Sequence, residues 1–395
     1  MRGSEAAGSG VPESYDAVVV GAGPAGSATA SLLAGQGRSV LLLDAAHFPR
    51  AKACAEYISP GGVAILQRLG AFETLDLGQT GRWLDGMRII PPSGASHLVT
   101  YGQRHHALSV PRRALDMALL ELARGHGAHV REGFRVQRVW REGRQIRGVV
   151  GAAGERIEAG LVVGADGLQS VVAGALRLRR PARWPRRLGL TVHLAGVAWP
   201  AAHGEMWVGR HGYVGVAPLD DHGLLSVGAV LPLPRPAAHR ATRGGSEPAM
   251  ARLQAALAEF PALARRLATG RPVEPVRGAG PLAQRVRANA GPGFALVGDA
   301  AGFFDPFTGE GIFRALRGAE LVAADLARYP AARAGAFGPK ERLTALIQLF
   351  VQVPALLEVA VRRLEARPHL ARRLGAILGD LEPASLDVAL RLLLP

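Results

Sequence analysis

The 395-residue chain is 48% hydrophobic and carries a formal net charge of +15. That apolar content suffices for a large core and indicates two interleaved domains. A single cysteine, Cys54, excludes an internal disulfide framework and is typical of a reducing compartment. No apolar run is long enough to span a membrane. We therefore expect a cytoplasmic protein, with peripheral membrane contact left open.

The positive charge comes almost entirely from arginines scattered along the chain, with Lys52 and Lys340 as the only lysines. No recognised nucleic-acid-binding motif accompanies this charge, so we expect no nucleic-acid partner. A basic surface can still attract anionic lipid or an acidic carrier protein. We expect no metal site.

The chain opens with residues 1–14, a Gly-, Ser- and Ala-rich segment that we expect to be a mobile tail. Residues 17–20 then form an apolar, β-branched run, as in a buried parallel strand. Three glycines follow at G-x-G-x-x-G spacing, namely Gly21, Gly23 and Gly26. The first allows a tight turn, the second lets a pyrophosphate approach the backbone, and the third lets the next helix pack on the strand.

A second apolar strand, residues 39–43, ends in Asp44, at the distance expected for a carboxylate that binds a ribose hydroxyl. A glycine motif alone is weak evidence. Strand, glycines, helix, strand and acid in this order predict dinucleotide binding. The alternative is a glycine-rich turn in an ordinary βαβ unit, and this stretch alone does not distinguish FAD from NAD.

Residues 48–60 are expected to form a loop, which leads into a helix over 61–69. Cys54 lies in this loop close to Lys52. A thiol with a lowered pKa is one interpretation. A small, half-buried hydrophobic residue is the other, and the spacing favours it.

Residues 84–101 contain alternating strand-forming residues and predict strands of a second sheet. A helix is expected over 109–126, with Arg112 and Arg113 near its start, where either side chain can reach a phosphate or stay in solvent. Four short alternating segments within 127–160 predict a β-meander.

A buried strand over 161–164 ends in a Gly-Ala-Asp-Gly turn, where Asp166 can accept a hydrogen bond from a cofactor or cap the next helix. Strands within 188–234, separated by Pro- and Gly-rich turns, predict an antiparallel sheet. Residues 235–246 are expected to be a mobile connection, and residues 247–267 a broken pair of helices.

An apolar strand over 294–297 runs into Gly298 and Asp299, and a Gly-rich segment then opens a helix over 313–326. An aspartate at a strand end, followed by glycines that open a helix, suits contact with ribityl hydroxyls and a ring system. Residues 333–395 predict helices broken at prolines. We expect them to pack on the sheet, with a basic membrane-contact helix as the alternative.

With these landmarks the chain resembles the FAD-dependent oxidoreductases built like aromatic hydroxylases, and within them the geranylgeranyl reductase branch. The glycine motif, the turn at Asp166 and the segment 298–312 match the family's three FAD motifs in order. Residues 52–60 are similar to the Lys-x-Cys-Gly loop of that branch, and residues 212–218 to its Tyr-x-Trp-x-Phe-Pro motif.

The resemblance implies a set of FAD contacts, namely Gly21, Gly23, Ala25, Gly26, Asp44, Lys52, Arg112, Asp166, Gly167, Gly298, Asp299, Pro306, Gly309, Gly311 and Ile312. It also implies that Cys54 lies near the flavin. Our hypothesis is that a hydride passes from reduced flavin to a C=C bond of a hydrophobic, polyprenyl-like substrate. Cys54 or Tyr213 would then supply the proton, and Glu56 would orient the loop. The reductant would be NAD(P)H or a reduced electron-carrier protein.

The chain departs from the family pattern at three positions. Ala55 replaces a glycine, Gly215 replaces the aromatic residue of the substrate motif, and Ala173 stands where an arginine is common. The Trp-x-Trp-x-Ile-Pro pattern of flavin halogenases is missing. A monooxygenase of the same fold that hydroxylates an aromatic or polyketide-type metabolite stays an alternative, as does a non-catalytic flavin- or lipid-binding protein.

The expected fold class is α/β, with a Rossmann-like FAD-binding domain containing a parallel sheet and a β-meander, an antiparallel-sheet substrate domain and a helical C-terminal region. The expected boundaries are 1–14 for the tail, 15–82, 109–177 and 285–330 for the FAD-binding domain, 83–108 and 178–284 for the substrate domain, and 331–395 for the helical region.

Overall fold

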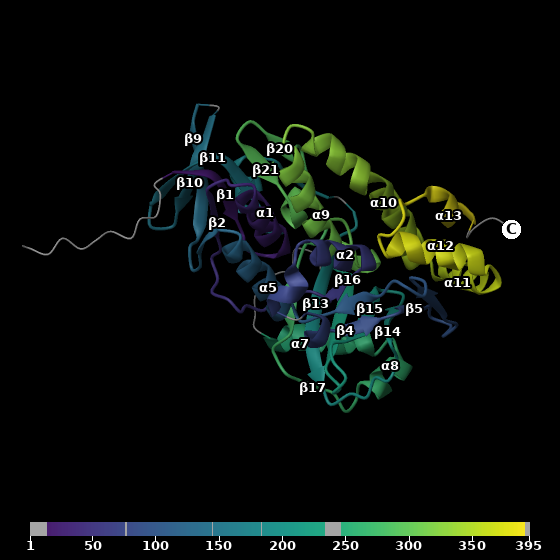
Figure 1. Cartoon of the computed structure of the whole chain (residues 1–395). Coiled ribbons are helices and arrows are strands. Elements are labelled where there is room, and N and C mark those ends of the chain that lie inside the picture. The colour runs from purple at the N-terminus through teal and green to yellow at the C-terminus, as the bar shows by residue number, and fades with distance from the viewer. Residues whose placement is uncertain (1–13, 76, 144, 183, 234–245, 392–395) are drawn as a thin grey trace, which may run out of the picture.

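The computed structural model describes residues 14–75, 77–143, 145–182, 184–233 and 246–391 (Figure 1). The expected α/β class is confirmed, because a parallel sheet with a meander, a largely antiparallel sheet and a helical C-terminal region are all present. The expected mobile tail and the expected connection at 235–246 lie outside the described residues, except for Ser14 and Ser246.

The first sheet is built around β1 (Ser14–Val20), which pairs in parallel with β2 (Val40–Leu43) and β11 (Arg156–Gly164). Strand β2 is buried along its whole length, which explains its continuous apolar sequence. The remaining strands on this path are β8 (His129–Arg131), β20 (Ala290–Gly291) and β21 (Phe294–Leu296).

Three helices pack together with this sheet. Helix α1 (Pro24–Gly35) contacts both α5 (Arg112–Gly125) and α9 (Gly311–Ala324). The fully buried Ala28 and Ala30 let the neighbouring helices come close to α1. The helix that follows the glycine motif is therefore held from both sides.

The meander consists of β9 (Val136–Glu142), β10 (Gln145–Gly151) and β11, which pair antiparallel in that order. The first predicted segment of the meander, residues 128–131, is placed differently. It forms β8, which pairs in parallel with β2 at the sheet edge. An alternating pattern does not reveal whether the partner strand is parallel or antiparallel.

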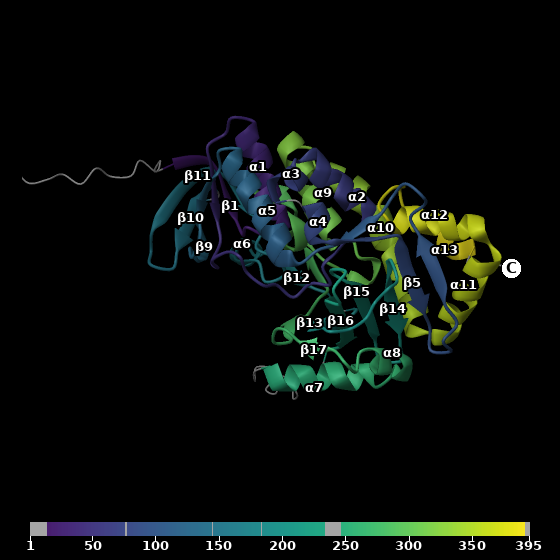
Figure 2. The ribbon, with the colours of Figure 1, turned by 60° about the horizontal axis from the view of Figure 1, so that its bottom comes forward.

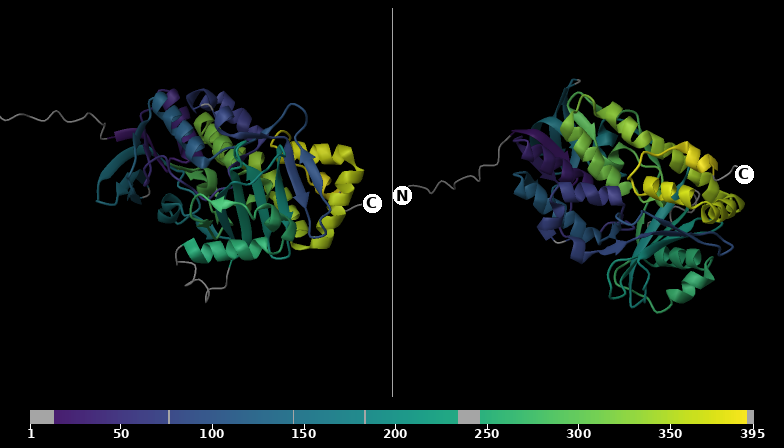
Figure 3. Two further views of the ribbon diagram at one scale, coloured as in Figure 1. Left: turned by 90° about the horizontal axis from the view of Figure 1, so that it is seen from below. Right: turned by 45° about the vertical axis from the view of Figure 1, so that its right-hand side comes forward.

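The second sheet has the order β17-β13-β16-β15-β14-β5-β6. Its strands are β5 (Gly86–Ile90), β6 (His97–Thr100), β13 (Arg187–Ala195), β14 (His203–Val208), β15 (Tyr213–Pro218), β16 (Leu225–Pro232), β17 (Arg271–Pro272) and β18 (Arg277–Ala279). Only β14 and β5 pair in parallel along this path. Helices α7 (Ser246–Leu257) and α8 (Pro261–Arg266) lie at one side of this sheet, as Figures 2 and 3 show.

A small sheet joins the half of the molecule built on the first sheet to the half built on the second sheet. Strand β7 (Ala107–Ser109) pairs with β3 (Tyr57–Ile58) and with β4 (Arg82–Leu84). The predicted strand region 84–101 is thus divided, because Leu84 belongs to this small sheet while β5 and β6 belong to the large one. The other short elements are α2 (Pro60–Arg68), α3 (Ala71–Leu75), α4 (Leu77–Thr80), α6 (Val171–Ala175), β12 (Arg179–Pro181) and β19 (Gln284–Val286).

The C-terminal region consists of α10 (Tyr329–Gln352), α11 (Pro354–Ala366), α12 (Pro368–Leu378) and α13 (Leu386–Arg391). Its buried side chains form one hydrophobic cluster with Ile89 and Val99 of β5 and β6. Within the described ranges, no single helix has the length and apolar character to cross a membrane. Helices α10 and α11 meet those criteria only as a pair, and the pair is bent by 112°.

Candidate cofactor and substrate site

The loop between β1 and α1 has room only for glycine at two positions. Gly21 adopts φ +98°, and a Cβ there would lie 2.6 Å from the Ala165 carbonyl oxygen. At Gly26 a Cβ would lie 1.7 Å from the carbonyl oxygen of Gly21. Helix α1 begins at Pro24 with Gly23 as its N-cap and no capping side chain, so its first amides can bind an anion.

Asp44, at the end of β2, faces this loop. Its Oδ2 accepts a hydrogen bond from the Ala22 amide at 2.8 Å, and its Oδ1 accepts one from the Ala46 amide at 2.9 Å. The guanidinium of Arg50 lies 3.5 Å from Asp44 Oδ2. The carboxylate therefore orders the glycine loop from the side on which a ribose was expected.

Two guanidinium groups lie beside the same loop, and the charge of Lys52 is close to both. A Cβ on Gly23 would lie 3.5 Å from Arg50 Nη2 and 3.8 Å from Arg112 Nη2. Partial burial, together with the positive charges of Arg50 and Arg112, lowers the pKa of Lys52. Closely spaced cations next to free helix amides can bind the negatively charged oxygens of a pyrophosphate.

Arg112 and Asp116 form a buried, bidentate ion pair at 2.8 and 3.0 Å. The second guanidinium, Arg50, also lies 3.5 Å from Asp116 Oδ2. The resemblance to the family motif predicts Arg112 at the cofactor. Arg50 was not identified from the sequence, since nothing in its spacing distinguishes it from other loop arginines.

Asp166 performs one of the two roles predicted for it, that of a helix cap, and its contact with the cofactor stays a prediction. Its Oδ2 accepts hydrogen bonds from the amides of Val171 and Val172 at 2.6 and 3.3 Å and thus caps α6. Its Oδ1 is buried without a hydrogen-bond partner among the described residues. A Cβ on the neighbouring Gly167 would lie 3.8 Å from Lys52 Nζ. One carboxylate oxygen is therefore left for a cofactor hydroxyl.

The third motif begins in a short 3-10 helix, Gly298–Ala301. Gly298 packs closely on α1, where a Cβ on it would lie 2.8 Å from Ala25 Cβ. Burial raises the pKa of Asp299, and the nearby positive charges of Lys52 and Arg112 oppose that shift. The structure thus brings the three predicted cofactor segments together, although they are far apart in the sequence.

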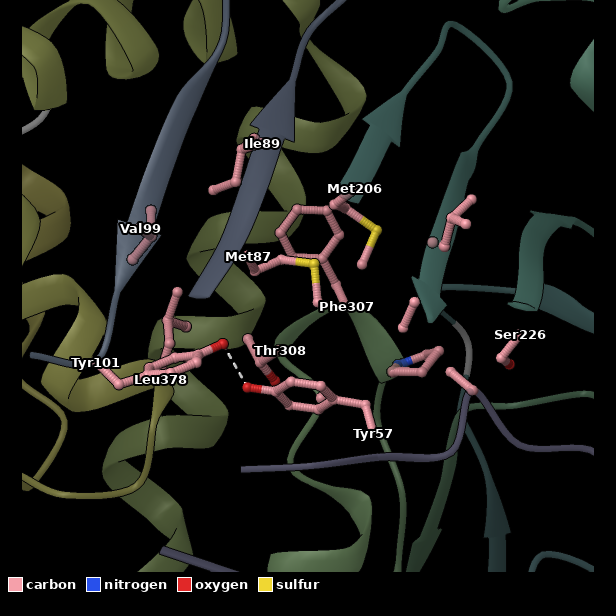
Figure 4. Close-up of a pocket in the computed structure, with 16 residues that line it drawn as sticks. Tyr57, Met87, Ile89, Val99, Tyr101, Met206, Ser226, Phe307, Thr308 and Leu378 are labelled. Carbon is pink, nitrogen blue, oxygen red and sulfur yellow. Dashed lines mark hydrogen bonds between the residues drawn. The ribbon is translucent and has the colours of Figure 1, made fainter. Parts of the chain in front are cut away.

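The same motif continues into a second 3-10 helix, Pro306–Thr308, and then to Gly309, which adopts φ +68°. Gly311 is the first residue of α9, and Ile312 follows it into the buried core. Of the predicted cofactor contacts, Pro306 and Gly309 also line a second space, an apolar cavity on the side of the large sheet (Figure 4).

This cavity is walled by strands β5, β6, β14, β15 and β16, the loop 306–309 and Leu378 of α12. Figure 4 shows Met87, Met206 and Phe307 gathered at its centre. Gly215 and Gly228 face each other across β15 and β16, so side chains are missing where a sheet would normally fill this space. No Lys, Arg, Asp or Glu is among the lining residues that the structure describes.

The loop of the predicted catalytic residues lies beside the cavity. Ala55 lines it, and the Cys54 Sγ accepts a hydrogen bond from the Glu56 amide at 3.3 Å. Burial raises the pKa of Cys54, so the side chain is a neutral thiol. This agrees with the half-buried hydrophobic interpretation that the spacing favours, and not with a lowered pKa. Glu56 is buried and accepts a hydrogen bond from the Arg112 amide at 3.0 Å.

Tyr213 lies behind the cavity wall. Its hydroxyl donates to Asp305 Oδ1 at 2.6 Å, and its ring makes an edge contact with Phe307, with the ring centroids 5.1 Å apart. Phe307 lines the cavity, and Tyr213 is not among the lining residues described. Two other phenols line it, Tyr57 and Tyr101, which are hydrogen-bonded to each other. Because these two tyrosines are far apart in the sequence, no sequence pattern predicts that they pair.

Comparison with known proteins matches these observations. Residues 14–336 match the family described as "FAD binding domain". The chain is 33% identical over 331 residues to menaquinone reductase from Mycolicibacterium smegmatis, covering 78% of this chain and 75% of that protein. It is 30% identical over 334 residues to digeranylgeranylglycerophospholipid reductase 1 from Methanococcoides burtonii, covering 80% and 74%. The solved structure of a myxobacterial chondrochloren halogenase superposes with a TM-score of 0.71 at 27% identity, covering 80% and 76%.

The fold and the site define an FAD-dependent oxidoreductase. The chain belongs to the FAD-binding-domain family, and the predicted resemblance to its geranylgeranyl reductase-like branch is confirmed. The predicted cofactor, FAD, is confirmed with it. The roles of the individual site residues stay predictions.

Proposed function

We propose that this enzyme reduces C=C bonds of a polyprenyl or related lipid substrate. The observation that carries the proposal is the apolar cavity, which shares the loop 306–309 with the cofactor motif. A hydrophobic chain in this cavity would lie against the same loop that holds the cofactor. The names of the two reductase relatives, which refer to menaquinone and to a digeranylgeranyl lipid, support a hydrophobic substrate.

When bound, FAD supplies the electron pair, delivered as a hydride, that such a reduction requires. The chain's own groups bind and orient the cofactor and the substrate. The glycine loop, Arg50 and Arg112 hold the pyrophosphate, and the apolar walls exclude water from the reacting carbons. NAD(P)H or a reduced carrier protein provides the electrons beforehand.

Cys54 is the proposed proton donor. Reduction of an alkene adds one hydride and one proton, and burial keeps a proton on the Cys54 Sγ at neutral pH by raising its pKa. Glu56 positions the loop through its contacts with Arg112 and His193. Tyr213 is the second proposed donor, although its hydroxyl is committed to Asp305.

One observation favours an oxygen-dependent alternative. The match to the chondrochloren halogenase covers most of the chain, and Gly215 leaves space in the cavity where the reductase motif carries an aromatic residue. A monooxygenase acting on an aromatic or polyketide-type metabolite is therefore the second candidate.

Turnover without oxygen separates the two. We expect the chemically reduced, FAD-loaded enzyme to convert a polyprenyl substrate anaerobically to a product that is heavier by two hydrogens. A product that forms only with oxygen and gains an oxygen or halogen atom would contradict the reductase. Cys54→Ala should keep FAD, as judged by its visible spectrum, but lower kcat by about 10²-fold or more. Cys54→Ser tests whether a weaker acid of similar size restores part of that rate.

A further inference from the structure

We infer that Tyr57, Tyr101 and Thr308 form a recognition site for a neutral oxygen atom at one end of the apolar cavity. The ligand is a lipid whose head is a ring bearing a carbonyl or hydroxyl oxygen, as in a quinone or a phenol. This inference rests on the proposed function, because it names the head group of the substrate in the same cavity.

The tyrosine pair carries one proton more than its internal hydrogen bond uses. Tyr57 and Tyr101 are both buried, and Figure 4 shows their hydroxyls directed at each other. Two phenols carry two protons, and the hydrogen bond between them uses one. No acceptor for the remaining O–H is found among the described residues. A buried donor left without an acceptor is costly, so a ligand oxygen would stabilise it.

Thr308 provides a second, independent observation. Its side chain is 6% exposed, lines the cavity beside the tyrosine pair, and its Oγ1 has no hydrogen-bond partner within the described part of the chain. Buried hydroxyls in native proteins are nearly always bonded. Two neighbouring groups therefore lack partners at the same end of the cavity, whereas the unpartnered hydroxyl of Ser226 lies apart from them (Figure 4).

The charges around this end favour a neutral head group. No cation is among the described lining residues, so a phosphate would find no ion-pair partner there. Asp380 lies close enough to act on both phenols: burial raises the pKa of Tyr57 and Tyr101, and the negative charge of Asp380 raises each further. Both tyrosines are thus neutral, and one O–H of the pair is left to donate. The nearby cation Lys340 is paired with Asp380, so it offers no free charge to an anionic head.

The site is fixed to the cofactor loop. A Cβ on Gly309 would lie 2.7 Å from Tyr57 Cδ1, so the Tyr57 ring rests directly on the predicted cofactor residue. An oxygen held by the pair would set how far the attached chain extends along the cavity. The chain position that reaches the cofactor loop would follow from that anchor.

Binding to the oxidised, FAD-loaded protein tests the inference without turnover. The probes are a naphthoquinone with a short prenyl chain, a naphthalene with the same chain, and a prenyl phosphate of equal chain length, each titrated by calorimetry. We expect Tyr101→Phe and Thr308→Val each to weaken quinone binding about 3- to 10-fold and to leave naphthalene binding unchanged. Tyr15→Phe, which removes a phenol bonded to His129 at 3.2 Å outside the cavity, is the matched control.

Three outcomes would overturn the inference: no quinone binding by the parent, equal quinone affinity in parent and variants, or prenyl phosphate binding with the same dependence on Tyr101. If Tyr101→Phe loses FAD, Thr308→Val still decides the question. The proposed function fails separately. A quinone that binds through Tyr101 but is never reduced would contradict the reductase and leave the recognition site standing.

Discussion

The Glu56 carboxylate and the His193 imidazole meet across the boundary between the two halves of the molecule, with Oε2 and Nε2 2.5 Å apart. His193 belongs to β13 of the large sheet, whereas Glu56 lies in the loop of Cys54 and adopts φ +60°. On its other side, His193 Nδ1 lies 3.2 Å from Glu274 Oε1. This contact ties the strained loop of the proposed proton donor to the substrate sheet.

The contact makes stability depend on pH. Burial alone would lower the pKa of His193, but the hydrogen bond and charge of Glu56, with Glu274, outweigh burial and raise it. A histidine whose folded pKa is raised stabilises the fold fully below its unfolded pKa of about 6.5, and this contribution is lost as pH rises through the folded value. We expect Tm to fall as pH increases through that window.

His193→Gln should remove this slope and lower Tm at pH 6, since charged hydrogen bonds contribute on the order of 1.5 to 3 kcal/mol. Thermal unfolding of the FAD-loaded protein between pH 5.5 and 8.5 measures both effects. His211→Gln removes an exposed histidine that pairs with Glu259 at 2.7 Å and serves as the control. If the curves of Tm against pH are parallel for the parent and His193→Gln, the contact contributes no pH-dependent stability.

Gly215 determines how much space the cavity offers. A Cβ there would lie 3.5 Å from Met206 Cε, an ordinary van der Waals distance. Gly215→Ala should therefore fold, bind FAD and turn over at close to the parent rate. Gly215→Trp should fill the cavity and raise KM by about tenfold or more while FAD stays bound, because a bulky side chain occupies the ligand's volume. Unchanged kinetics in Gly215→Trp would mean that the substrate binds elsewhere.

The cofactor motifs could be located from the sequence because their residue types are dictated by the backbone. Gly21 and Gly26 admit no side chain, and Asp44 must follow its strand to reach the loop. The tyrosine pair could not be found this way. Tyr57 and Tyr101 meet only because β3, β7 and β6 are brought together in space, and no local pattern encodes that meeting. The same limit explains the misplaced segment 128–131, whose partner strand depends on tertiary packing.

Arg50 lies at the predicted cofactor site although no sequence pattern indicated it, and we expect its removal to weaken FAD binding. Its guanidinium lies above the glycine loop and pairs with Asp44 and Asp116. Arg50→Gln should raise the Kd for FAD by about 10- to 100-fold, the loss expected for a charged hydrogen bond to a phosphate. Fluorescence titration of the apoprotein with FAD measures this Kd.

The control for this prediction is Arg68→Gln, which removes an exposed arginine that pairs with Glu320 at 2.7 Å and should leave the Kd for FAD unchanged. An equal loss of FAD affinity in both variants would argue against a specific role of Arg50.

The corner between α10 and α11 is the surface that we expect to contact membranes. Leu349 and Val353 are 49% and 45% exposed there, and exposed arginines such as Arg362 and Arg372 lie on the helices that follow. Insertion of an apolar side chain into a bilayer contributes about 1.5 to 3 kcal/mol, and the arginines would attract anionic headgroups.

Val353→Glu should therefore reduce co-sedimentation with vesicles rich in anionic lipid by about tenfold or more. Val273→Glu, at a 55% exposed valine beside β17, introduces the same charge away from this corner. If the two variants sediment alike, the corner makes no membrane contact, and a lipid substrate would have to reach the cavity by another route.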